Sequence, residues 1–254
     1  MKNKLFKKTG AALLAIACVI AGGFISAEAD ETAVPAASAG KIATEHVMAD
    51  QYEDPFKEYT EPVSGAAELK LSCKSAVLME QSTGKVLYEL NPHEKVAPAS
   101  ITKVMSLLLF MEAIDGGRMK QDDSVSTSSY AASMGGSQIW LEPGELMTVH
   151  ELLKAVCIAS ANDATVALAE KVSGSEEAFV ARMNERAAEL GCADTHFMNA
   201  SGLDADGHVT SAMDVAIMSR ELMKHPKIHE YTSIWMDTLR AGQSKLVNTN
   251  KLVC

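Results

Sequence analysis

The pattern of apolar and polar positions becomes regular near Leu69 and first predicts two β-strands. Residues 75–80 and 85–90 carry apolar side chains at most positions, and short apolar runs bounded by turn residues are typical of strands. The residues Gln-Ser-Thr-Gly at 81–84 separate the two runs. Because a short connection that contains Gly favours antiparallel pairing, the two segments predict a β-hairpin.

The middle of the chain instead predicts helices, because apolar residues recur there at helical spacing. The run from Ser100 to Ile114 is apolar on every face and ends at Asp115-Gly-Gly, so we expect a helix that is buried on all sides. Further helices are expected at residues 149–159, 163–172 and 176–190, and from 212 to just before Pro226. Two strands followed by several helices predict an α+β domain that is short of strands.

Cap residues mark the ends of three of these helices. The starts carry the sequences Thr148-Val-His-Glu151, Ser173-Gly-Ser-Glu176 and Ser211-Ala-Met-Asp214. In the first of them a Thr followed three residues later by Glu is a capping box. Gly191 follows the third helix, where glycine is the favoured terminating residue.

The N-terminus has the organisation of an export signal. Four lysines within the first eight residues precede an uncharged stretch at 11–24, and Ala27-Glu-Ala29 then offers small residues for cleavage. The apolar stretch is too short to span a bilayer comfortably, so a cleaved signal is favoured over an uncleaved anchor. Residues 30–67 are rich in Ala, Glu and Pro without sustained periodicity, which indicates a linker. We therefore expect a signal peptide at 1–29, a linker at 30–67 and one domain at 68–254.

Charge and composition then exclude several classes of partner. The formal net charge is −10, and the clustered Lys and Arg that phosphate backbones require are missing, so a nucleic-acid partner is not expected. No second apolar run reaches membrane length, so we expect no transmembrane helix in the mature chain. The cysteines that remain at 73, 157, 192 and 254 have no metal-site spacing, and we expect no obligatory disulfide, no metal and no cofactor.

Candidate chemistry lies in a Ser-x-x-Lys pair. The pattern occurs at Ser38/Lys41, Ser82/Lys85 and Ser100/Lys103, but the first pair falls in the linker and the second in the hairpin turn. Only Ser100 and Lys103 open a helix, where side chains three residues apart share a face. Burial in an apolar helix lowers the pKa of a lysine, which would make Lys103 a base for a nucleophilic Ser100. The alternative is a helix-capping Ser with a Lys that reaches out to water.

A second candidate element is Ser160-Ala161-Asn162, the Ser-x-Asn that falls at a predicted break between helices. The Ser160 hydroxyl could relay a proton between Lys103 and a leaving amine, and the Asn162 amide could bind a substrate carbonyl and hold the lysine. The alternative is a plain helix cap, because Ser and Asn both favour that position.

Together the two elements resemble the penicillin-recognising serine enzymes, whose motifs include Ser-x-x-Lys and Ser-x-Asn. The chain is most similar to the low-molecular-mass D-alanyl-D-alanine carboxypeptidases, over residues 74–252. The segments that carry the likeness are Ala97–Lys103, Gly136–Leu141, Ile158–Ala164 and Asn199–Asp204. The resemblance implies a β-lactamase/transpeptidase-like domain with a helical subdomain and a cofactor-free serine D,D-carboxypeptidase of the cell wall.

By carry-over, Ser100 is the acylated nucleophile, Lys103 its general base, and Ser160 and Asn162 the proton relay and substrate binder. The substrate implied is a peptidoglycan stem peptide that ends in D-Ala-D-Ala, and β-lactams are implied as inhibitors. The location implied is extracytoplasmic, at the cell wall or the outer face of the cytoplasmic membrane.

Three departures from the family pattern change the expectation. Ala161 stands where the family often has Gly, and the family's C-terminal β-rich domain and membrane anchor are missing. The third motif is missing as well, because Lys8-Thr-Gly10, within the predicted signal, is the one Lys-Thr-Gly in the chain. We therefore expect a catalytic domain that lacks its C-terminal sheet strands, and a 254-residue form with little or no activity.

Three other functions remain as alternatives. A β-lactamase of class A would need Glu-x-x-x-Asn after Asn162, which the chain does not contain. A catalytically dead exported module that binds the wall is compatible with the missing third motif. Zinc binding by His225 and His229 is disfavoured, because Pro226 lies between them and no Glu follows His225.

The cleavage site gives a first prediction. In an exporting host the mature protein should begin at Asp30, because Ala27 and Ala29 fit the small-residue positions before the cut. Mass spectrometry of the secreted protein measures this directly. An intact Met1 on membrane-bound protein would indicate an anchor instead.

Overall fold

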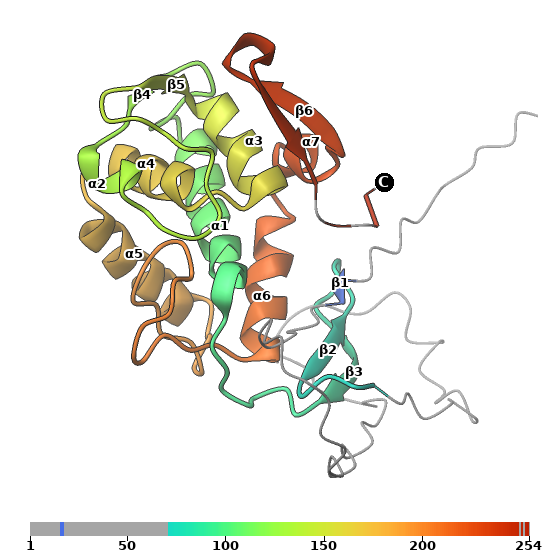
Figure 1. Ribbon diagram of the computed structural model, residues 1–254. Coiled ribbons are helices and arrows are strands. Elements are labelled where there is room, and N and C mark those ends of the chain that lie inside the picture. The colour runs from blue at the N-terminus through green and yellow to red at the C-terminus, as the bar shows by residue number, and fades with distance from the viewer. Residues whose placement is uncertain (1–15, 18–70, 249, 251, 254) are drawn as a thin grey trace, which may run out of the picture.

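The computed structural model describes residues 16–17, 71–248, 250 and 252–253. The predicted linker, and the predicted signal apart from Ile16–Ala17, lie outside these residues. The predicted hairpin is confirmed: β2 (Ala76–Met79) pairs antiparallel with β3 (Val86–Leu90), with Ala76 opposite Leu90. The short strand β1 (Ile16–Ala17) adds to the open edge of β2, as Figure 1 shows at the lower right.

The central element is α1 (Lys103–Asp115), which the other long helices surround (Figure 1). Its side chains at Met105, Leu108, Phe110 and Met111 have no exposed surface. Three helices pack directly against it, namely α4 (Asn162–Ser173), α5 (Glu176–Glu189) and α6 (Ala212–Leu222). The expectation of a helix buried on all sides is therefore confirmed, and α6 also connects α1 to strand β2.

One boundary differs from the prediction. The segment Ala99–Thr102 is a 3₁₀ turn, η2, and the α-helix begins only at Lys103. A 3₁₀ turn has three residues per turn, so side chains three positions apart lie directly above one another. This geometry places the side chains of residues 100 and 103 on the same face, one above the other.

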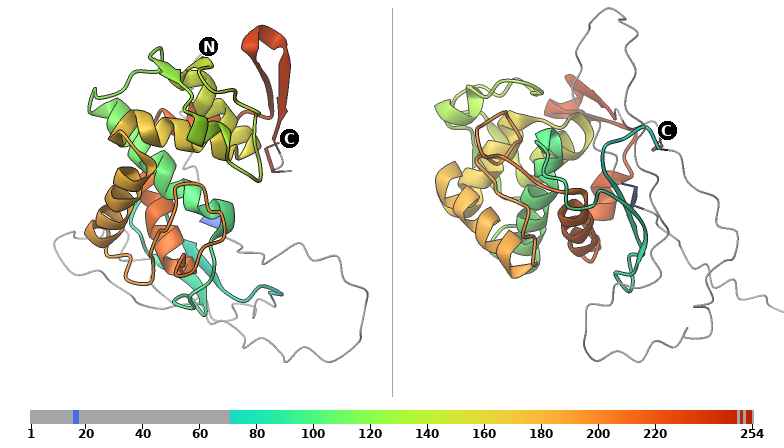
Figure 2. Two further views of the ribbon diagram at one scale, coloured as in Figure 1. Left: turned by 60° about the vertical axis from the view of Figure 1, so that its left-hand side comes forward. Right: turned by 90° about the horizontal axis from the view of Figure 1, so that it is seen from below.

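The predicted caps are present. Helix α3 (Val149–Ala159) begins with the complete capping box of Thr148 and Glu151, and the Ser175 and Ser211 side chains cap α5 and α6. The remaining elements are small and lie toward the outside of the molecule (Figure 2). They are β4 (Ser124–Ser126), α2 (Ser129–Ala132), β5 (Leu146–Thr148), α7 (Ile228–Thr232), β6 (Met236–Leu239), η3 (Arg240–Gly242) and β7 (Ser244–Val247).

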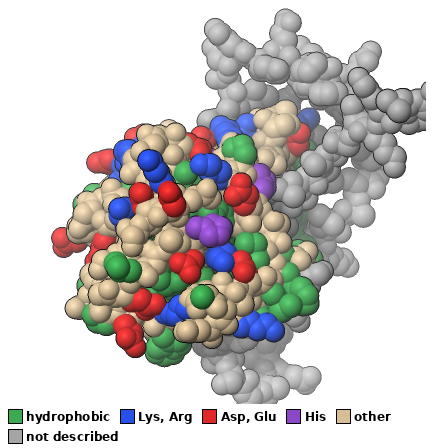
Figure 3. All heavy atoms as spheres, turned by 90° about the horizontal axis from the view of Figure 1, so that it is seen from above, with side chains coloured by type: hydrophobic (Ala, Val, Ile, Leu, Met, Phe, Trp, Pro, Cys, Tyr) green, Lys and Arg blue, Asp and Glu red, His purple; other side chains and the backbone are tan. Residues whose placement is uncertain are grey.

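The described surface carries both signs of charge. On the face in Figure 3, acidic and basic side chains are interspersed, and no continuous basic patch crosses it. No helix among the described residues is long and apolar enough to cross a membrane. The thiols of Cys73, Cys157 and Cys192 are free, and Cys254 lies outside the described residues.

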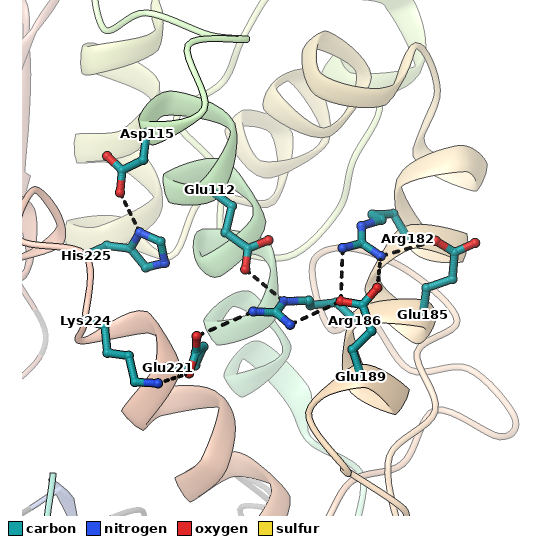
Figure 4. A network of polar contacts seen from close by, with 9 residues as sticks. All are labelled: Glu112, Asp115, Arg182, Glu185, Arg186, Glu189, Glu221, Lys224 and His225. Atoms are coloured by element: carbon teal, nitrogen blue, oxygen red, sulfur yellow. Dashed lines mark hydrogen bonds and ion pairs between the residues drawn. The ribbon is translucent and has the colours of Figure 1, made fainter. Parts of the chain in front are cut away.

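A polar network joins α1 to two of the helices around it, α5 and α6 (Figure 4). From α5, Arg186 donates through Nε to Glu112 of α1 at 2.8 Å and through Nη2 to Glu221 of α6 at 3.5 Å. Its Nη1 donates to Glu189 of its own helix at 3.1 Å. The side chains of Arg186, Glu112 and Glu221 are each only about one-fifth exposed. The Arg186 guanidinium therefore compensates the charges of two carboxylates that are largely shielded from water.

Replacing Arg186 tests this role. Arg186→Met keeps the aliphatic packing but leaves Glu112 and Glu221 without their shared cation, and we expect a loss of roughly 1–3 kcal/mol in the free energy of unfolding. Urea denaturation followed by circular dichroism measures the change. The control is Arg182→Met, since the Arg182–Glu189 pair is 39% and 47% exposed and an exposed pair contributes about 1 kcal/mol or less. Equal losses in the two variants would contradict the bridging role.

Candidate active site

Ser100 lies at the exposed start of the central helix. It occupies the second position of η2, while Thr102 and Lys103 behind it are buried. Ala99 before it has φ +46°, an unusual conformation for a residue with a side chain. Such strain persists only where the surroundings impose it and is frequent at functional sites. The Ser100 N–H donates to no group of the described residues, so it is free to bind an anionic oxygen from solvent or a ligand.

Lys103 is the buried partner of Ser100. Its side chain is only 4% exposed. Nζ lies 3.2 Å from Ser100 Oγ, 2.7 Å from Asn162 Oδ1 and 2.6 Å from the carbonyl oxygen of Ser201. Burial lowers the pKa of the Lys103 ammonium from 10.5 to about 8, because removal from water disfavours the charged form.

The three hydrogen-bond partners of Lys103 Nζ determine where the lone pair of the neutral amine points. An amide oxygen and a backbone carbonyl can only accept hydrogen bonds, whereas a hydroxyl can also donate. A neutral Lys103 has two N–H bonds, which point to Asn162 Oδ1 and Ser201 O. Its lone pair is then directed at the Ser100 hydroxyl, as removal of the serine proton requires.

Asn162 holds the lysine from α4. Its amide nitrogen donates to the carbonyl of Gly135 at 2.7 Å, and its oxygen accepts from Lys103. These two partners determine which way the amide faces, because one only accepts and the other only donates. Gly136 lies against this amide with φ +77°, and a Cβ at Gly136 would be 2.7 Å from Asn162 Nδ2. A glycine is needed here both for the backbone angle and for the space.

The next residue, Asp163, fixes the loop that passes over Asn162. Its fully buried carboxylate accepts from the backbone N–H groups of Ile139 and Leu141 at 3.0–3.2 Å. Between them Trp140 has φ +58° and is 76% exposed. The loop is therefore attached rigidly to the residue that follows Asn162, and it holds a large aromatic ring in solvent.

A loop without regular secondary structure completes the site. Asn199 Oδ1 accepts the N–H groups of Ser201, Gly202 and Leu203 at 2.7–3.2 Å, which shapes the turn. Gly202 has φ +89°, and a Cβ there would lie 1.9 Å from the carbonyl oxygen of Ala99. The loop backbone thus packs directly on the peptide that precedes Ser100. A cavity of about 440 Å³ lies alongside, between residues 97–99 and 202–206.

His208 connects this loop to the start of α1. The backbone N–H of Met198 donates to Nδ1 at 3.0 Å, so the proton of the neutral ring is on Nε2, which donates to Thr102 Oγ1 at 2.7 Å. Burial lowers the pKa of His208, which keeps the ring neutral. This matches a structural role for the histidine.

No metal site accompanies these residues. Within the described part of the chain, no three His, Cys, Asp or Glu side chains gather in a group that could hold an ion.

Comparison with known proteins identifies the family. Residues 61–254 match the family of D-alanyl-D-alanine carboxypeptidases known as peptidase S11. The chain belongs to the D-alanyl-D-alanine carboxypeptidase family. It is 56% identical over 190 residues to the carboxypeptidase DacF of Bacillus subtilis strain 168, covering 74% of this chain and 49% of that protein. With the carboxypeptidase DacC of Escherichia coli K12 it shares 38% identity over 203 residues, or 76% of this chain and 50% of that one. The chain spans about half the length of these curated relatives.

Solved structures of the same family confirm the fold class. Penicillin-binding protein 5 from Haemophilus influenzae aligns with a TM-score of 0.70 at 30% identity, over 74% of this chain and 56% of that one. Penicillin-binding protein D2 from Listeria monocytogenes, solved with bound ampicillin, aligns with a TM-score of 0.61 at 31% identity, over 74% of this chain and 76% of that one. The expected α+β fold of the penicillin-binding carboxypeptidases is therefore confirmed.

Within this carboxypeptidase fold, the structure brings three of the four predicted site residues into contact. Ser100, Lys103 and Asn162 share hydrogen bonds through Lys103 Nζ. For the fourth, Ser160, no hydrogen bond among the described residues joins its hydroxyl to Ser100 or Lys103. Ser160 is half-buried at the end of α3 with φ +55°. Its role as a relay stays a prediction.

Sequence reasoning missed the supporting groups of the site. The Ser201 carbonyl, the Asp163 carboxylate and the His208 ring each hold part of it. The segments 158–164 and 199–204, which carried the family likeness, contain Asp163 and Ser201, whereas His208 lies outside every such segment. A backbone carbonyl has no sequence signal, so its contact with Lys103 is visible only in the structure.

Gly202 gives a sharp prediction for this site. Gly202→Ala places a Cβ 1.9 Å from the Ala99 carbonyl oxygen, so Ser100 must shift, and we expect at least a tenfold slower reaction of Ser100 with a fluorescent penicillin. The control is Gly207→Ala, since Gly207 has a similar φ of +81° and no atom within 4 Å of the added Cβ. Gel fluorescence measures labelling, and circular dichroism checks folding. Equal rates for the two variants would contradict the close-packing argument.

Proposed function

We propose that this protein is a serine D,D-carboxypeptidase that removes the terminal D-alanine of peptidoglycan stem peptides through an acyl-enzyme on Ser100. The observation that supports this most is the contact of Ser100 Oγ with Lys103 Nζ at 3.2 Å while two fixed acceptors hold the other donors of Nζ. Family membership adds the reaction class, and the D-Ala-D-Ala substrate follows from it.

The proposed reaction has two steps. Ser100 Oγ loses its proton to Lys103 and attacks the carbonyl carbon of the penultimate D-alanine, while the free N–H of Ser100 stabilises the oxyanion. The C–N bond then breaks, and the amine of the departing D-alanine takes the proton from Lys103, with Ser160 as the proposed relay. Water hydrolyses the ester and frees Ser100. In this scheme Asn162 binds the substrate through the amide N–H that Gly135 does not occupy.

The domain boundaries and the location form part of the same proposal. Residues 1–29 are proposed as a cleaved signal peptide, 30–67 as a linker and 68–254 as the penicillin-binding domain. The protein would then act outside the cytoplasm, at the cell wall or the outer face of the membrane. Two relatives are named D-alanyl-D-alanine carboxypeptidases, and a substrate within peptidoglycan would place the reaction outside the cytoplasm. β-Lactams are proposed as inhibitors, because the Listeria protein was solved in ampicillin-bound and cefotaxime-bound forms.

Covalent labelling tests the nucleophile. The 254-residue chain is expected to react slowly, so the incubation with a penicillin is long. It should still add the mass of one inhibitor, and peptide mapping should place the adduct on Ser100. Ser100→Ala should carry no adduct, and Lys103→Arg should block it because a guanidinium stays protonated. Ser82→Ala is the matched control, since Ser82 and Lys85 repeat the Ser-x-x-Lys spacing on an exposed turn. Absence of a Ser100 adduct in the unmodified chain would overturn the proposal.

The pH dependence tests the base. Only neutral Lys103 can take the serine proton, and its pKa is about 8. We therefore expect the acylation rate to rise with pH through the range 6–8 and to level off above about pH 8. Labelling reactions at a fixed penicillin concentration, quenched at a series of times, measure the acylation rate at each pH. A rate that is independent of pH over 6–9 would contradict the role of Lys103 as the base.

A further inference from the structure

A buried carboxylate lies behind the active site without a cation. Glu176, the first residue of α5, is only 9% exposed. Its Oε1 accepts the backbone N–H of Ala200 at 2.9 Å, and its Oε2 accepts the hydroxyl of Tyr130 at 2.6 Å. Both partners are neutral donors. Burying a carboxylate in this way is costly, so the contact with Ala200 calls for an explanation.

Ala200 stands next to the carbonyl that binds Lys103. The loop from 199 to 203 contains no helix or strand, so side chains rather than a backbone ladder hold it in place. Ser106 Oγ donates to the Ala200 carbonyl at 2.6 Å, and Glu176 accepts the Ala200 N–H. The next carbonyl, that of Ser201, accepts from Lys103 Nζ at 2.6 Å. The position of this acceptor therefore depends on how residue 200 is held.

We propose that Glu176 is a positioning residue for Lys103, which acts by holding the Ala200 backbone so that the Ser201 carbonyl stays within reach of Nζ. This rests on the proposed acylation of Ser100. Neutral Lys103 needs both fixed acceptors to direct its lone pair at Ser100 Oγ. If the Ser201 carbonyl is not held in place, the Lys103 amino group can rotate about its Cε–Nζ bond, and its lone pair no longer points at Ser100 Oγ.

The geometry separates this role from a plain electrostatic one. Glu177 follows Glu176 on the same first turn of α5, carries the same charge and is exposed. Both carboxylates interact with the positive end of the helix dipole. Of these two glutamates, Glu176 is the one that binds the loop, through the Ala200 N–H. We therefore expect the position of its carboxylate oxygens, and not its charge, to affect Lys103.

Three variants test reach against charge. Glu176→Gln keeps an oxygen at the same distance without the charge, and Ser100 should be acylated by penicillin within threefold of the unmodified rate at pH 7. Glu176→Asp keeps the charge but withdraws the oxygens by one methylene, and acylation should fall at least tenfold. Glu177→Ala removes the neighbouring charge and should leave the rate unchanged. Thermal melts confirm that each variant is folded.

A second measurement does not depend on turnover. In protein labelled with ¹³C at lysine Cε, the Lys103 resonance, assigned by its loss in Lys103→Met, reports the pKa of Lys103 by NMR titration. Glu176→Asp should raise that pKa toward 10.5 because a loosened Nζ gains water, while Glu176→Gln and Glu177→Ala should leave it near the value of the unmodified chain.

Each outcome decides a different claim. The positioning role is wrong if Glu176→Gln is as slow as Glu176→Asp, because the reach of the side chain then does not explain the loss. It is also wrong if Glu177→Ala is as slow as Glu176→Asp, because the effect is then not specific to the residue that binds Ala200. An unchanged Lys103 pKa in folded Glu176→Asp also overturns it. If the unmodified chain forms no Ser100 adduct, the proposed function fails, and the titration alone then decides whether Glu176 positions Lys103.

Discussion

The burial of a single amine, that of Lys103, is the constraint on which the site depends. A lysine that is 4% exposed is tolerated only if its nitrogen is hydrogen-bonded and its charge can be given up near neutral pH. The protein meets both conditions with three oxygens, from Ser100, Asn162 and Ser201, which come from three separate segments. The lowered pKa and the direction of the lone pair are consequences of the same burial.

The surrounding packing serves to keep those three oxygens in place. Helix α1 is enclosed by α4, α5 and α6, so the segment after Ser100 cannot relax toward solvent. Asn162 opens α4, and Asp163 beside it anchors the loop that carries Gly135 and Gly136. The network of Arg186 joins α1, α5 and α6 on the opposite side. The strained Ala99 persists because the elements on either side of it are fixed.

Close backbone approach explains two of the glycines in the site. Gly136 and Gly202 both have positive φ, and a side chain at either would strike a neighbouring group, the Asn162 amide or the Ala99 carbonyl. Between them these contacts bring the loops at 135–141 and 199–203 against Ser100 and Lys103. In the first loop the strained residue Trp140 lies between the two N–H groups that Asp163 accepts, and its ring is exposed.

Local chemistry in the sequence was sufficient for the elements and for the central pair. Two short apolar runs and a Gly-containing turn predicted the β2–β3 hairpin, and the longer apolar run predicted a buried α1. The Thr148–Glu151 pattern predicted a capping box. Each of these signals depends on neighbours a few residues apart. The spacing of Ser100 and Lys103 is likewise local, although the 3₁₀ turn that aligns them was missed. The tertiary structure alone decided the partners of Lys103 that lie 59 and 98 residues away. A carbonyl such as that of Ser201 looks like every other carbonyl in the sequence, and only the packing of distant segments selects which one meets the amine.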